Sequence, residues 1–122
     1  MNYPHRELNR QIIGAAMTVH NKLRVGLREK AYENALKIEL GKRGHALEQQ
    51  KAFEVRYDGE LVDTLIPDLI VDESIIVDPK CVTEFTDAHT SQMIGYLAIT
   101  GLKVALLLNF KNDRLRWKRI VR

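Results

Sequence analysis

The sequence predicts an α/β protein of the α+β class, with one domain in which a mixed central β-sheet is flanked by helices. Three observations predict this fold. Residues 7–43 carry apolar side chains at helical spacing, residues 47–82 follow a strand-like pattern around turn residues, and residues 103–110 form a short apolar run. The predicted order is ααβββαββ. A three-strand meander, a crossover helix and a buried strand together require both antiparallel and parallel pairs.

Two helices are expected in the first part of the chain. The first covers residues 7–23, where apolar side chains recur near helical spacing, and Val25-Gly26-Leu27 interrupts it. The second covers residues 28–43, and Gly44 suits its C-terminal cap.

Strands are expected next. Residues 47–57 lead into Asp58-Gly59, a strong hairpin turn signal, and residues 61–71 return from it. Residues 72–74 turn the chain again before a third strand, residues 75–82.

A third helix and two more strands complete the expected elements. Thr86 suits the N-cap of a helix that runs to Thr100, and Gly101 ends it. Residues 103–110 are strongly apolar, which predicts a central, buried strand. A last short strand is expected over residues 116–121.

Composition excludes several classes of protein. No stretch approaches the roughly 20 apolar residues that span a bilayer, and the first ten residues show no apolar signal-peptide core. Cys81 is the only cysteine, which excludes an internal disulfide and a multi-cysteine zinc site and fits a reducing cytoplasm. We therefore expect a cytoplasmic protein without a membrane partner.

The net charge of +3 and the pI of about 9.1 are only mildly basic, but the cations cluster near the C-terminus. They are Lys111, Arg114, Arg116, Lys118, Arg119 and Arg122, opposed only by Asp113. A solvated terminal face and a phosphate-binding strip explain this cluster equally well.

The second hairpin brings two acidic residues together. If residues 72–74 form a three-residue loop, Val71 pairs with Ile75, and counting outward places Asp68 opposite Asp78. One face of the hairpin is then apolar and should lie against the helices: Leu69, Val71, Ile75, Val77 and Cys81. The other face carries Ile66, Asp68, Ile70, Ile76, Asp78 and Lys80. A loop one residue longer or shorter would move one aspartate to the opposite face.

Opposed carboxylates need compensation, because like charges directly across a sheet destabilise it. Two carboxylates about 4 Å apart repel by about 4 kcal/mol at an effective dielectric of about 20. A divalent cation such as Mg²⁺, which prefers hard oxygen ligands, offsets this best. Lys80 offsets part of it, and a surface Asp–Lys ion pair is the simpler alternative.

Several motifs together resemble one known family. Pro67-Asp68 followed by Asp78-Pro79-Lys80 reads as the signature P-D…(D/E)-x-K of the PD-(D/E)XK nuclease superfamily. Residues 26–32, Gly-Leu-Arg-Glu-Lys-Ala-Tyr, resemble the defining motif of the GxxExxY proteins, a small family placed in that superfamily. Gln92 and Tyr96 resemble the Q-x-x-x-Y helix motif of its RecB-like branch. The resemblance covers nearly the whole chain and implies one restriction-endonuclease-like domain over residues 1–122.

The resemblance implies a metal-dependent hydrolase that cuts phosphodiester bonds, with DNA favoured over RNA as its partner. Asp68, Asp78 and the backbone carbonyl of Pro79 would bind Mg²⁺ or Mn²⁺, and Glu29 would reach the ion directly or through water. Lys80 would hold or help deprotonate the attacking water. The family usually has Glu-Leu-Lys where this chain has Asp78-Pro79-Lys80, and Pro79 should sit at a sheet edge or a strand end.

Other residues of the helices have both functional and structural interpretations. Gln92 and Tyr96 share one helix face and would contact the attacking water or a phosphate, and His89 lies a turn before Gln92. Ordinary helix surface, a half-buried aromatic and a structural histidine are the alternatives. For Glu29 the alternative is a favourable charge in a helix's first turn. Tyr32 is expected to be packing.

Nucleic-acid contacts would come from one set of residues: Tyr96, His89, Lys111, Arg114, Arg116, Lys118 and Arg119. The sequence is also compatible with a homodimer. The main rival is a catalytically inactive module of the same fold that binds nucleic acid or a protein partner.

Overall fold

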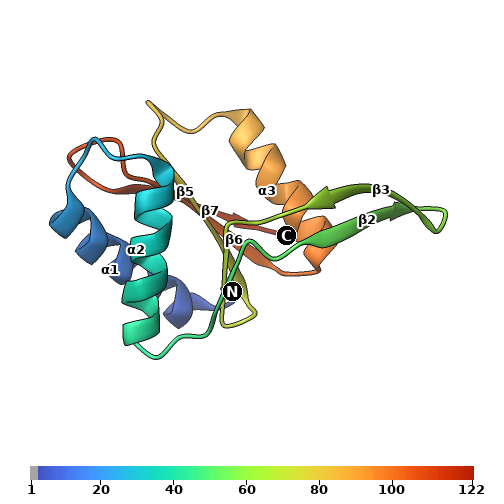
Figure 1. Ribbon diagram of the computed structural model, residues 1–122, viewed down its shortest axis with the longest axis horizontal. Helices are drawn as coiled ribbons and strands as arrows, with labels where there is room; N and C mark the ends of the chain where they lie inside the picture. The colour runs from blue at the N-terminus through green and yellow to red at the C-terminus, as the bar shows by residue number, and fades with distance from the viewer. Residues whose placement is uncertain (1–2) are drawn as a thin grey trace.

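The computed structural model describes residues 3–122 and shows a β-sheet between two helical layers (Figure 1). The helices are α1 (Arg6–Leu23), α2 (Glu29–Lys42) and α3 (Asp87–Thr100). The main sheet contains, in spatial order, β1 (Leu47–Gln49), β4 (Leu69–Val71), β5 (Ile75–Lys80), β6 (Val104–Asn109) and β7 (Arg116–Val121). β2 (Phe53–Tyr57) and β3 (Glu60–Leu65) form a separate hairpin, which projects away from the sheet in Figure 1.

The predicted fold class is confirmed, but two of the predicted strands are each divided in two. Residues 47–57 become β1 and β2, and residues 61–71 become β3 and β4, so the observed order is ααβββββαββ. The first division lies at Gln50, whose φ of 57° is left-handed and ends the extended backbone. The second lies at Ile66-Pro67-Asp68, where proline lacks the N–H that a sheet ladder needs.

The sheet is mixed, as predicted. β5 pairs antiparallel with β4 and parallel with β6, and β6 pairs antiparallel with β7. All six residues of β6 are buried, which confirms a central strand. Asp72 and Glu73 have φ values of 50° and 54° in a three-residue loop, and Val71 pairs with Ile75 as predicted.

The two faces of the sheet support separate cores. Side chains of α1 and α2 pack with Leu69, Val71, Ile75 and Val77, so this face of the hairpin lies against helices as predicted. The opposite face packs Ile70 and Ile76 under Met93 and Leu97 of α3. Side chains of β6 alternate between these two cores, which is why its sequence is continuously apolar.

Local signals at the helix ends account for their boundaries. Thr86 caps α3 as predicted: its hydroxyl accepts from the His89 N–H at 3.4 Å, and Nδ1 of His89 accepts from the Thr86 N–H at 3.0 Å. Gly101 ends the helix with a left-handed φ of 77°. This cap fixes the start of α3 over the face of the sheet that carries Asp78 and Lys80.

Candidate active site

Asp68 and Asp78 come together where β4 begins and β5 continues beyond it. Leu69 pairs with Val77 as predicted, so the next residue outward on each strand is an aspartate. The Asp68 carboxyl group raises the pKa of Asp78 through both hydrogen bonding and charge. Pro79 follows past the last β4 pair, in the part of β5 that pairs only with β6, so its missing N–H removes no bond to β4.

Burial and charge both act on Asp78, which is 4% exposed. Burial first, and then the hydrogen bond and charge of Asp68, raise its pKa to about 7, while Lys80 opposes this shift. The Lys80 ammonium lies 3.5 Å from Asp78 Oδ2. Lys80 therefore compensates the two acidic groups only in part, and the surroundings of Asp78 favour its protonated form.

A hydrogen-bonded chain leads from Lys80 to α3. Lys80 Nζ donates to Gln92 Oε1 at 3.4 Å, and Gln92 Nε2 donates to the Tyr96 hydroxyl at 3.2 Å. Burial, followed by the charges of Asp78 and Asp68, raises the pKa of Tyr96. The i, i+4 pair on α3 thus faces the acidic pair, and the structure brings together Asp68, Asp78, Lys80, Gln92 and Tyr96.

Glu29 contacts the backbone next to the site and not the acidic pair. Its carboxylate Oε2 accepts from the backbone N–H of Cys81 at 2.8 Å, so it holds the chain just after Lys80. Tyr32, in the same motif, is fully buried, stacks on Phe110 with ring centroids 4.5 Å apart, and is packing as expected. The Gly26–Tyr32 segment therefore anchors the end of β5 from the α2 side.

Two residues that sequence reasoning missed lie beside Asp68. Gln50 Nε2 donates to Asp68 Oδ1 at 3.1 Å and to Glu33 Oε2 at 3.0 Å, and Glu33 is 3% exposed. A signal was present, because Glu33 lies on the same helical stripe as the buried Leu36 and Leu40. A charged side chain on a buried stripe requires polar partners nearby.

The sequence matches the PD-(D/E)XK nuclease superfamily over residues 6–120. The chain belongs to this superfamily. The fold is also similar to the crystal structure of SSO0001, with a TM-score of 0.59 and 19% sequence identity, over 74% of this chain and 48% of that chain. The chain thus spans about half the length of SSO0001. No curated protein matches the chain.

PD-(D/E)XK nucleases generally use divalent metal ions, and the acidic pair fits such an ion. Asp78 and Asp68 offer hard carboxylate oxygens at one place, and burial together with Asp68 raises the pKa of Asp78, which a bound cation would counter. Within residues 3–122, no group of three or more His, Cys, Asp and Glu side chains could hold one ion. Backbone carbonyls and water would therefore complete the coordination.

The register of the PD-(D/E)XK sheet separates the C-terminal cations. Asp78 pairs with Leu107, which pairs with Lys118, and Lys80 pairs with Asn109, which pairs with Arg116. Lys118 and Arg116 of β7 therefore point to the face of the acidic pair. Arg119 points to the other face, where it donates to the Pro4 carbonyl at 2.7 Å and its guanidinium lies 3.8 Å from the Tyr3 ring centroid.

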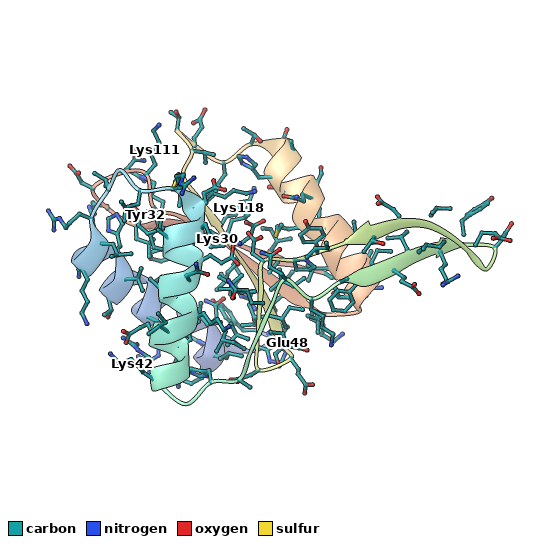
Figure 2. The ribbon with its side chains drawn as sticks, in the orientation of Figure 1. Lys30, Tyr32, Lys42, Glu48, Lys111 and Lys118 are labelled. Carbon is teal, nitrogen blue, oxygen red and sulfur yellow. The ribbon has the colours of Figure 1, made fainter. Side chains whose placement is uncertain are left out.

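The other predicted cations lie elsewhere. Lys111 and Arg114 are exposed in the loop between β6 and β7, and Figure 2 shows Lys111 at this loop and Lys118 on β7. His89 uses its Nδ1 in the α3 cap and packs its ring edge-on to Phe85. None of the helices in residues 3–122 is both long and apolar enough to cross a membrane.

Proposed function

We propose that this chain is a divalent-metal-dependent nuclease of the GxxExxY type that hydrolyses phosphodiester bonds of nucleic acid, DNA rather than RNA, within a single domain over residues 1–122. The observation that carries the proposal is the buried Asp78 carboxyl group against Asp68, with the Lys80 ammonium 3.5 Å from Asp78. An ordinary Asp–Lys ion pair lies on the surface, whereas Asp78 is buried. The second carboxyl group, from Asp68, is what a cation-binding site requires in addition to such a pair.

Each residue of the site then has a defined role. Asp68, Asp78 and the Pro79 carbonyl hold Mg²⁺ or Mn²⁺, which when bound activates water and offsets charge on the phosphate. Lys80 orients the attacking water and faces the phosphate, because its Nζ is held between Asp78 and Gln92.

Residues around the site position these groups. Gln92 fixes the rotation of the Lys80 side chain, and Tyr96 in turn fixes the Gln92 amide through its hydroxyl. Glu29 holds the backbone after Lys80 through the Cys81 N–H. In this proposal Glu29 acts on the shape of the site, and its contact with the ion is indirect, through water.

Nucleic acid would approach along the face of the sheet that carries Asp78. Lys118 and Arg116 lie across β6 from Asp78 and Lys80, which places cations where the flanking phosphates of a bound strand would run. Lys111, Arg114, His89 and Tyr96 extend this surface. Arg119 contributes through the fold, since its guanidinium is committed to Tyr3 and Pro4.

A cleavage assay tests the proposal. Labelled DNA and RNA, single- and double-stranded, are incubated with Mg²⁺, Mn²⁺ or EDTA and the purified chain. We expect cutting that requires the divalent ion and that D78N abolishes. The matched control is D63N, which removes the same charge from an exposed position of β3 in the separate β2–β3 hairpin. Cutting that survives D78N, or that D63N abolishes equally, rules out this assignment of the site.

The second candidate function is an inactive nuclease-fold module that binds nucleic acid or a protein partner. The observation that favours it is that only two acidic side chains meet at the site within residues 3–122. Under this function, the chain binds labelled DNA through the Lys118 face and cuts none of the substrates with any ion. Isothermal titration with Mn²⁺ would then show no binding that depends on Asp78.

A further inference from the structure

Gln50 makes two hydrogen bonds to Asp68. Its backbone N–H donates to the Asp68 carbonyl at 3.0 Å, and its side-chain Nε2 donates to Asp68 Oδ1 at 3.1 Å. Gln50 has the left-handed φ of 57°, a conformation that L-residues with side chains adopt at a cost. This conformation follows directly after β1 and turns the Gln50 side chain toward both Asp68 and α2.

The buried Glu33 carboxylate fixes the orientation of the Gln50 amide. Glu33 Oε2 accepts from Gln50 Nε2 at 3.0 Å and from Gln49 Nε2 at 2.6 Å, and Lys30 Nζ lies 3.1 Å from Oε1. Carboxylates only accept, so an amide between Glu33 and Asp68 must place its NH₂ group between them. The two donors of that group then serve one carboxylate each.

Burial makes this arrangement rigid. Glu33 is 3% exposed, and a buried carboxylate that lost its donors would bear a large desolvation penalty. Figure 2 shows Lys30 on α2, one helical turn before Glu33. Glu33 thus connects α2, through the Gln50 amide, to the Asp68 carboxylate.

We propose that Gln50, held by Glu33, is a positioning residue that sets the Asp68 carboxylate for divalent-ion binding; this rests on the function proposed above. Asp68 precedes β4 and has no ladder partner of its own, so its rotation is not fixed by the sheet. Gln50 supplies that restraint. Residues that orient metal ligands in this way affect affinity by roughly ten-fold to a hundred-fold when removed.

The test compares two neighbouring glutamines. Q50M removes the amide that touches Asp68, and Q49M removes an amide that touches Glu33 but not Asp68. We measure Mn²⁺ affinity by titration with electron paramagnetic resonance, and the melting temperature in EDTA. We expect Q50M to weaken Mn²⁺ binding by about ten-fold, to lower kcat at limiting Mn²⁺, and to recover at saturating Mn²⁺. Q49M should bind Mn²⁺ as the unmodified chain does.

A second pair of variants tests the support that Glu33 gives to Gln50. E33Q retains an oxygen that can accept from Gln50 and should keep Mn²⁺ affinity, while E33M should match Q50M. Mn²⁺ affinity unchanged in Q50M, or reduced equally in Q49M, would overturn the positioning role even if the chain cuts DNA. Weaker Mn²⁺ binding in Q50M, in a chain that cuts nothing, would support the positioning role and reject the nuclease function. If the unmodified chain does not bind Mn²⁺, both proposals fail.

Discussion

Lys118 and Asp78 lie in one row across the sheet, with Leu107 of β6 between them. Strands in a sheet are about 4.8 Å apart, so two strand spacings place the Lys118 and Asp78 backbones roughly 10 Å apart. Lys118 also donates from Nζ to the Thr90 hydroxyl at 2.9 Å, which ties it to the first turn of α3. This row places an acidic centre and a cation on the same face of the sheet, the one over which α3 packs.

The first prediction concerns this cation. K118Q should weaken binding of DNA and reduce the slope of log affinity against log salt by about 1, because one phosphate contact is lost. The measurement is fluorescence anisotropy over a salt series in the D78N background, which prevents cutting. K42Q is the control, since it removes an equal charge at the far end of α2 (Figure 2). Equal slopes for K118Q and K42Q would place the DNA on another face.

The second prediction concerns stability and pH. Burial and Asp68 raise the pKa of Asp78 to about 7 in the folded chain, against about 3.9 for an unfolded aspartate. The folded state therefore holds the proton more tightly. The contribution of this proton to the free energy of unfolding is fully present below about pH 4. It is lost as pH rises toward about 7 and amounts to a few kcal/mol at most. D78N lacks this titration and should gain stability relative to the unmodified chain over that range.

Urea unfolding in EDTA at a series of pH values checks this prediction. The informative quantity is the change with pH of the difference between D78N and the unmodified chain, since any constant effect of the new amide cancels. Adding Mn²⁺ at pH 8 should raise the unfolding midpoint of the unmodified chain and leave that of D78N where it was. A difference that stays flat from pH 4 to pH 8 would contradict a raised pKa at Asp78.

The third prediction separates two roles for Glu29. Its Oε2 accepts from the Cys81 N–H at 2.8 Å, a bond that a glutamine oxygen could also accept. E29Q should therefore keep Mn²⁺ affinity and activity, and E29A should lower kcat by about five-fold through loss of about 1 kcal/mol of positioning. If E29Q weakens Mn²⁺ binding as strongly as D68N does, Glu29 is a direct ligand.

Sequence alone could predict the acidic pair because the length of one loop determines the β4–β5 register. A three-residue turn after Val71 pairs Leu69 with Val77, and alternation then sends both aspartates to one face. The apolar side chains of the other face supply an independent check, because a shifted register would place one aspartate among the apolar side chains under α1 and α2. Fold class and the mixed sheet follow from the same local patterns.

The support around Asp68 could not be predicted in this way. It depends on the left-handed backbone of Gln50, which no glycine or asparagine signals, and on a contact with α2 that is distant in sequence. Proline at position 67 is a sequence signal for the division between β3 and β4. The Asp58-Gly59 turn signal nearby is stronger and accounts for a hairpin without that division. Strand alternation alone sends Lys118 and Arg119 to opposite faces, but which of them faces Asp78 depends on the β6–β7 register, which the loop between the strands leaves free.

The last prediction uses two tyrosines whose hydroxyl groups have different partners. The Tyr32 hydroxyl donates to the Arg24 carbonyl at 2.6 Å and accepts from the Leu27 N–H at 3.3 Å, so it stabilises the turn between α1 and α2. The Tyr96 hydroxyl accepts from Gln92, which accepts from Lys80. Y32F should therefore cost about 1–2 kcal/mol of stability and leave kcat nearly unchanged.

Y96F should do the reverse. It leaves the half-buried ring in place, so the melting temperature should hardly move, but the Gln92 amide loses the partner that fixes its rotation. We expect kcat to fall by about five-fold, which corresponds to about 1 kcal/mol for one hydrogen bond. Both variants lose a single oxygen atom, so each serves as the control of the other. Full nuclease activity in Y96F would remove α3 from the proposed catalytic network and leave Lys80 positioned by Asp78 alone.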